Sequence, residues 1–102
     1  MITADFKRLG LSPGARVLDL GCGSGRHTCE AFRYPQVTAV GADRNPADLA
    51  EARNRLRFHE AVGAHGGGRW ALLAADARQL PFPAAAFDVV ICSEVLEHIP
   101  EH

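Results

Sequence analysis

Long apolar runs, paired cysteines and a strong excess of charge are all missing from this 102-residue sequence. Its apolar runs fall far short of the ~20 residues that cross a bilayer, so no membrane partner is expected. The three cysteines, Cys22, Cys29 and Cys92, include no CxxC pair and predict neither a disulfide framework nor a zinc site. A net charge of −1 offers no basic field for nucleic acid. The start shows no secretory signal, and we expect a cytoplasmic protein.

Strand-like and helix-like segments alternate along the chain. Apolar runs at 16–20, 37–42, 70–75 and 87–92 predict strands, and segments 2–10, 26–34, 45–62 and 93–99 predict helices. The third helix begins with Asn45 as N-cap and Pro46 in the first position. Alternation of this kind favours a parallel sheet with right-handed crossovers. We therefore expect one α/β domain over residues 1–102, built on a Rossmann-like, doubly wound parallel sheet.

Apolar side chains at helical spacing predict the core. Leu49, Ala52 and Leu56 share the inward face of the third helix, and Trp70 with the five phenylalanines is interpreted as core. His59, His65 and His102 lie in polar or terminal stretches and are expected at the surface.

Glycines and acidic residues fall at the carboxyl ends of the first three predicted strands, where such sheets bind ligands. The first strand is followed by Gly21, Gly23 and Gly25, which let backbone approach a ligand closely. Asp43 closes the second strand, where a carboxylate can accept both hydroxyls of a ribose. Asp76 follows the third strand, where an acid can reach an adenine amino group. Their succession predicts a nucleoside-type ligand.

These segments resemble the class I S-adenosylmethionine-dependent methyltransferases. The stretch VLDLGCGSG at 17–25 is similar to the first motif of that family. The resemblance continues through VGAD at 40–43, ADA at 75–77, LPF at 80–82, FDVV at 87–90 and EVLEHI at 94–99. The small-molecule branch, of methyltransferase type 11, looks nearest. This resemblance implies strand order 3-2-1-4 within a seven-stranded fold, and hence a chain that lacks strands 5 to 7.

The resemblance also implies a set of residues that bind S-adenosyl-L-methionine: Asp19, Gly21, Cys22, Gly23, Gly25, Asp43, Arg44, Asp76, Ala77 and Ser93. In this family the glycines would cradle the methionine part of the cofactor. Asp19 would act at the methionine ammonium through water.

The remaining residues of the set would hold the nucleoside and close the cleft. The resemblance gives Asp43 the ribose diol, Asp76 the adenine amino group and the Ala77 backbone N–H the adenine ring. Ser93 would line the cleft near the methionine moiety. Arg44 departs from the family pattern, which often has an apolar residue there, although an arginine can stack on a purine.

No residue is assigned a catalytic role. A sulfonium methyl is already electrophilic, so the protein mainly aligns donor and acceptor and excludes water, and a general base depends on the acceptor. His27 is expected to contribute its backbone rather than its ring. Glu94, Glu97 and His98 share one helix face and could hold a divalent cation, but the same string is common in relatives without a metal, and no metal is expected.

The expected activity is methyl transfer to a small-molecule acceptor, with this chain supplying the cofactor-binding half. One alternative is a cofactor-binding fragment without catalysis. Another is an NAD(P)-dependent oxidoreductase, whose GxGxxG fingerprint differs from the GxGxG spacing at 21–25. Asp43 would also repel a 2′-phosphate.

Overall fold

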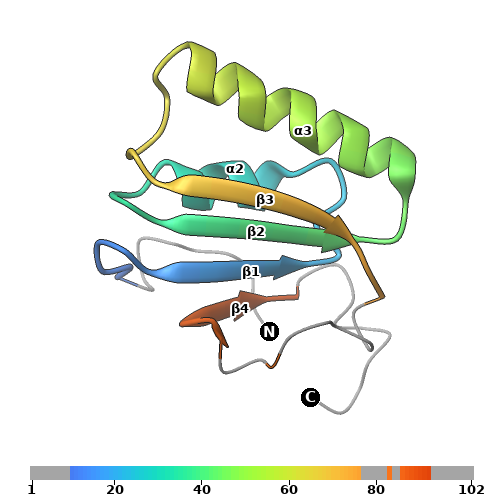
Figure 1. Cartoon of the computed structure of the whole chain (residues 1–102), viewed down its shortest axis with the longest axis horizontal. Helices are drawn as coiled ribbons and strands as arrows, with labels where there is room; N and C mark the ends of the chain where they lie inside the picture. The colour runs from blue at the N-terminus through green and yellow to red at the C-terminus, as the bar shows by residue number, and fades with distance from the viewer. Residues whose placement is uncertain (1–9, 77–82, 84–85, 93–102) are drawn as a thin grey trace.

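The computed structural model describes residues 10–76, 83 and 86–92. A four-stranded parallel sheet lies at its centre, in the order β3-β2-β1-β4 (Figure 1). Its strands are β1 (Arg16–Leu20), β2 (Thr38–Asp43), β3 (Arg69–Ala74) and β4 (Val89–Ile91). The predicted parallel α/β sheet and its order 3-2-1-4 are therefore confirmed.

Three strands differ from their predicted bounds. β2 lies one residue later than expected, at Thr38–Asp43 instead of 37–42. β3 lies one residue earlier than expected, since the Arg69 N–H already donates to the Val37 carbonyl at 3.0 Å. β4 begins at Val89 rather than at residue 87. Before it, the Asp88 N–H donates to the Arg16 carbonyl while the Asp88 carboxylate accepts from the Arg16 N–H, both at 2.8 Å. A side chain thus takes the place of one ladder partner at this end of the strand.

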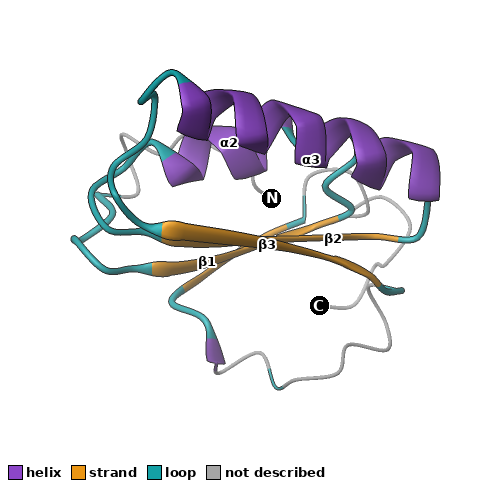
Figure 2. Cartoon of the chain, turned by 45° about the horizontal axis from the view of Figure 1, so that its top comes forward, coloured by secondary structure: helices purple, strands orange, loops and turns teal. Residues whose placement is uncertain are grey.

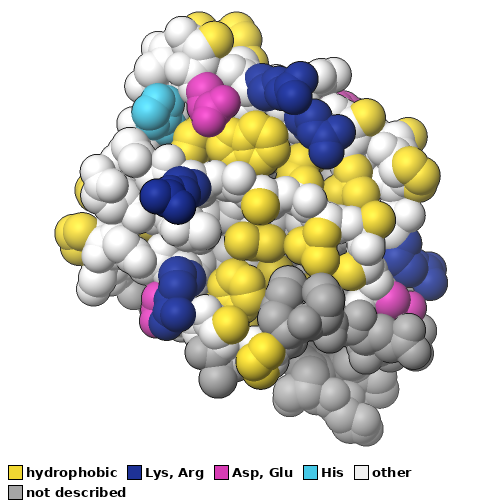
Figure 3. Space-filling view, viewed as in Figure 1, with side chains coloured by type: hydrophobic (Ala, Val, Ile, Leu, Met, Phe, Trp, Pro, Cys, Tyr) yellow, Lys and Arg dark blue, Asp and Glu magenta, His cyan; other side chains and the backbone are white. Residues whose placement is uncertain are grey.

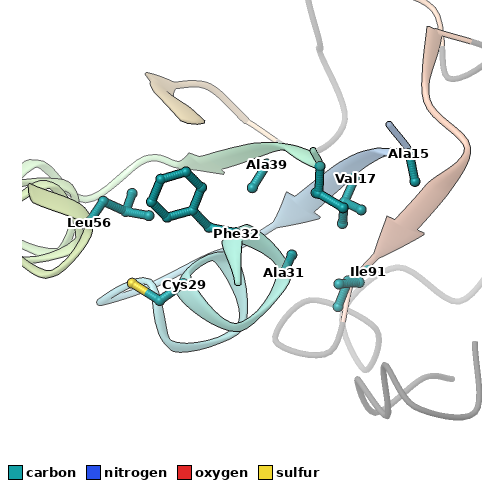
Figure 4. Close-up of a cluster of buried hydrophobic side chains, with 9 residues drawn as sticks. Ala15, Val17, Cys29, Ala31, Phe32, Ala39, Leu56 and Ile91 are labelled. Atoms are coloured by element: carbon teal, nitrogen blue, oxygen red, sulfur yellow. The ribbon is translucent and has the colours of Figure 1, made fainter. Parts of the chain in front are cut away.

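Both described helices, α2 (Arg26–Phe32) and α3 (Pro46–Ala61), cover the same face of the sheet (Figure 2). Phe32 of α2 points between Leu56 of α3 and Ala39 of β2 (Figure 4), and all three are at most 1% exposed. Burial of such side chains contributes about 1.5–3 kcal/mol each. The predicted helices at 2–10 and 93–99 lie outside the described residues.

The opposite face of the sheet also carries apolar side chains, because successive residues of a strand point to opposite faces. Leu18 is fully buried there, whereas Val90, its neighbour on β4, is 37% exposed. Figure 3 shows hydrophobic side chains gathered over the strands on this face. In the part of the chain that the structure describes, both helices lie on the other face.

Helix α3 begins as the sequence predicts. The Asn45 side chain accepts the N–H groups of Ala47 and Asp48 at 2.9 and 3.3 Å, and Pro46 occupies the first turn. Ala52 and Leu56 are buried and Leu49 is half-buried.

The core prediction is wrong for Phe58. Its side chain is 64% exposed, because two residues beyond Leu56 a helical side chain points to the opposite side. His65 is not simply a surface residue either, since its ring stacks on Phe32 with centroids 5.1 Å apart. Over the described ranges, no helix combines the length and apolarity needed to cross a membrane.

Candidate functional site

The carboxyl ends of β1, β2 and β3 meet at one edge of the sheet, as parallel strands must (Figure 1). The glycine loop, residues 21–25, follows β1 and leads into α2. Asp43 is the last residue of β2, and Asp76 lies two residues beyond β3. This edge is where open α/β sheets bind ligands.

The glycine loop folds back against the end of β2. The N–H groups of Gly21 and Cys22 both donate to the Ala42 carbonyl, at 2.8 and 3.0 Å, and the Gly25 N–H closes the turn on the Cys22 carbonyl at 2.9 Å. The φ angles of Gly21, Gly23 and Gly25 are +67°, +55° and +89°, in the left-handed region that favours glycine. The loop conformation therefore depends on glycine at these positions.

Gly25 has an additional packing role that needs no ligand. A Cβ placed on it would lie 2.7 Å from the Cβ of Ala52 in α3. Absence of a side chain thus lets the loop rest directly on α3. The expected contact of Gly25 with a cofactor stays a prediction.

Asp43 joins the glycine loop to the start of α3. One carboxylate oxygen accepts the Gly23 N–H and the other accepts the Asn45 N–H, each at 2.8 Å. An ionised carboxylate has about four acceptor positions, so two remain for hydroxyl donors. The structure thus brings together the predicted loop and the predicted ribose-binding acid.

Asp19 lies beneath the loop, between β1 and α2. It is 2% exposed and accepts the Thr28 hydroxyl at 2.8 Å. A buried carboxylate requires such hydrogen bonds to offset its loss of hydration. Its expected water-mediated contact with an ammonium group stays a prediction. Thr28 was not among the predicted site residues, since no motif in the sequence marks it.

Asp76 and Arg44 approach each other across the ends of β3 and β2. The Arg44 guanidinium lies 3.5 Å from the Asp76 carboxylate. The Arg44 side chain is 75% exposed and that of Asp76 is 31% exposed. The residue that departs from the family pattern thus contacts the acid expected to bind adenine.

The Cys22 thiol is buried in the loop. Burial, with the nearby Asp19 and Asp43 carboxylates, raises its pKa to about 12. The thiol is therefore protonated at neutral pH and is not a nucleophile.

A cavity of about 340 Å³ lies beside the loop and is lined by Cys22, Ser24, Arg26, His27 and Arg55. The Nδ1 atom of His27 is buried without a hydrogen-bond partner among the described residues. Two arginines give this cavity a cationic lining, although Arg55 also pairs with Glu51 at 3.7 Å.

The other predicted site residues lie outside the described part of the chain: Ala77, Ser93, Glu94, Glu97 and His98. Among residues 10–76, 83 and 86–92, no group of three or more His, Cys, Asp or Glu side chains is placed to hold a metal ion.

Residues 17–102 match the family described as "Methyltransferase domain". Malonyl-[acyl-carrier protein] O-methyltransferase of Legionella pneumophila is 37% identical over 82 residues, which are 79% of this chain and 26% of that protein. Trans-aconitate 2-methyltransferase of Streptomyces avermitilis is 38% identical over 89 residues, 86% of this chain and 31% of that protein.

A solved structure extends this similarity to the fold. The S-adenosylmethionine-dependent methyltransferase of Geobacter sulfurreducens, crystallised with S-adenosyl-L-homocysteine, is similar with a TM-score of 0.66 and 31% identity. The alignment covers 84% of this chain and 32% of that one. The alignments with this chain thus span between a quarter and a third of the length of these three proteins.

Proposed function

The chain belongs to the methyltransferase domain family, and from this membership we propose that it binds S-adenosyl-L-methionine for methyl transfer to a small-molecule acceptor. One observation carries the proposal: the Gly23 N–H lies 2.8 Å from the Asp43 carboxylate. This bond joins a glycine loop to an acid at the end of the next strand, which supports the proposal that the two bind neighbouring parts of one ligand.

The residues present fit this cofactor. Asp43 keeps free acceptor positions for the two ribose hydroxyls, and the loop glycines present no side chains to a methionine chain. In this proposal Asp76 would hold the adenine amino group, and the backbone N–H of Ala77 would bind the adenine ring. Ser93 would line the cleft near the methionine moiety, and Asp19 would act on the ammonium through water.

When bound, the cofactor supplies an electrophilic methyl group on a sulfonium. The residues of this chain would hold the methyl donor in place, so that the acceptor atom is aligned with the methyl group and the sulfur, and water is excluded. Its buried Cys22 thiol, with a pKa of about 12, takes no part as a base.

One relative supports a small-molecule acceptor, since it is named for trans-aconitate, whereas another is named for a malonyl group carried on a protein. The three free cysteines agree with a reducing, cytoplasmic setting.

The proposal is tested by calorimetric titration of the full-length protein with S-adenosyl-L-homocysteine, NADH and NADPH. We expect binding of the first ligand alone. Asp43→Ala should weaken it roughly 10- to 100-fold, because each charge-assisted hydrogen bond contributes about 1.5–3 kcal/mol. Asp76→Ala should weaken it less.

Asp48→Ala is the matched control, because Asp48 lies in the first turn of α3 but makes no carboxylate contact with the glycine loop among the bonds described above. It should leave the affinity within about twofold. Tight binding of NADH or NADPH that ignores Asp76→Ala would refute the methyltransferase proposal.

A further inference from the structure

We propose that Asp43 is a positioning residue that holds the glycine loop in its binding conformation before any ligand arrives. The Asp43 bridge, meaning its carboxylate with the Gly23 and Asn45 amides, joins the loop to α3. The part of this inference that concerns affinity rests on the proposed function. The part that concerns the ligand-free loop does not.

Three successive loop amides are directed at the end of β2. Those of Gly21 and Cys22 share the Ala42 carbonyl, which belongs to the backbone and is present in any sequence. The Gly23 amide instead donates to a side chain, the Asp43 carboxylate. The attachment of this third amide to the end of β2 therefore depends on a side chain, which a substitution can remove.

The second oxygen of Asp43 extends the bridge to α3. It accepts the N–H of Asn45, whose own side chain caps the helix through Ala47 and Asp48. The loop meets α3 a second time where Gly25 rests on Ala52. Only Ser24 lies between the two attached residues, Gly23 and Gly25. A glycine-rich segment is otherwise costly to order, so tethering it at both ends lowers the entropy lost on binding.

An isosteric variant separates the bridge from the size of the side chain. The amide oxygen of Asp43→Asn can accept only one of the two backbone N–H groups, and its NH₂ group then faces the other donor. Asp48→Asn is the matched control, since it removes the same charge within the first turn of α3.

The first measurement is backbone amide hydrogen exchange in the ligand-free, full-length protein. In the wild type the Gly23 amide should exchange at least tenfold more slowly than in an unstructured peptide. In Asp43→Asn it should exchange about tenfold faster than in the wild type, while the Leu18 amide in β1 stays unchanged. Asp48→Asn should match the wild type at both positions.

An unprotected Gly23 amide in the wild type overturns the proposal, and so does an unchanged Gly23 rate in Asp43→Asn. Faster exchange at Leu18 as well as at Gly23 would show general loss of structure and equally overturn a local role. The wild-type measurement stands even where the variant fails to fold.

The second measurement compares adenosine with 2′,3′-dideoxyadenosine, which lacks the diol. If Asp43 only binds the diol, Asp43→Asn should leave the affinity for the dideoxy ligand unchanged, and that result overturns the proposal. If Asp43 positions the loop, Asp43→Asn should weaken the binding of both ligands, and that of the dideoxy ligand by several-fold. The proposed function fails if the wild type binds no S-adenosyl-L-homocysteine, whereas the exchange measurement decides the bridge whether or not any ligand binds.

Discussion

At the end of β2 the Asp43 carboxylate is held by two backbone amides, each 2.8 Å away. At the end of β3, Asp76 lies 3.5 Å from the guanidinium of Arg44, whose side chain is 75% exposed. Backbone amides move only with the loop or helix to which they belong, whereas an exposed arginine can change rotamer in water at little cost. The two amide contacts of Asp43, at the ribose end of the proposed site, are therefore set by the fold, whereas the Arg44–Asp76 contact at the adenine end is adjustable.

The largest effect on ligand affinity is expected from a substitution at the β2 end, where the fold sets the contacts. Gly23→Val places a β-branched side chain at φ +55°, where the left-handed conformation is strongly disfavoured for such residues. The loop must then rearrange and the Asp43 bridge breaks. We expect more than 100-fold loss of S-adenosyl-L-homocysteine affinity by calorimetry.

Gly63→Val is the control for this prediction. Gly63 has a similar φ of +75°, but a Cβ there would meet nothing within 4 Å, and it lies just beyond α3. It should cost stability and leave affinity unchanged. Retention of affinity within threefold in Gly23→Val would remove the claim that the β2 end is set by the fold.

The β2 end is also the part of the site that sequence reasoning could predict. Its determinants are local, since Gly21, Gly23, Asp43 and the N-cap Asn45 lie next to the strand and helix ends that they shape. The strand order, by contrast, followed from the family resemblance alone.

The features that the sequence did not reveal come from contacts between distant segments. Position 25 must be glycine because a Cβ there would clash with Ala52, which lies 27 positions further along the chain. The Thr28 hydroxyl of α2 donates a hydrogen bond to Asp19 of β1. Arg44 and Asp76 meet only because β2 and β3 are neighbours. Periodicity identifies which face a residue occupies, but it does not identify its partner.

The adjustable Arg44–Asp76 contact predicts a smaller change in ligand affinity. Arg44→Leu removes an exposed ion pair, and such pairs contribute about 0–1 kcal/mol, which corresponds to at most about fivefold in affinity. We expect S-adenosyl-L-homocysteine binding about threefold weaker at low salt, with the difference shrinking at high salt. Arg53→Leu, at an exposed position on α3, should change nothing. A loss as large as that of Asp43→Ala would make the two ends equivalent and the comparison false.

A third carboxylate, at the amino end of the sheet, combines both kinds of partner. Asp88 accepts the Arg16 backbone N–H at 2.8 Å and also pairs with the Arg16 guanidinium at 3.2 Å. Both side chains are about half exposed. The hydrogen bond from the Arg16 side chain, and then that from its backbone, lowers the pKa of Asp88 from its usual 3.8.

This pKa shift yields the smallest predicted effect, and its sign follows from the proton balance. A carboxyl whose pKa is lower in the folded state stabilises the fold above its unfolded pKa, and that contribution is lost as pH falls through the folded value. Asp88→Asn should therefore be slightly less stable than the wild type at pH 7 in urea unfolding, and the gap should close below about pH 4. Asp48→Asn provides the control for a lost charge without these bonds.

If the backbone N–H is the partner that matters, Arg16→Gln, which keeps that N–H, should retain more of the pH 7 stability than Asp88→Asn does. A gap that stays constant from pH 7 to pH 3 would mean that Asp88 acts through shape alone, and backbone anchoring would then not distinguish the carboxylates of this sheet.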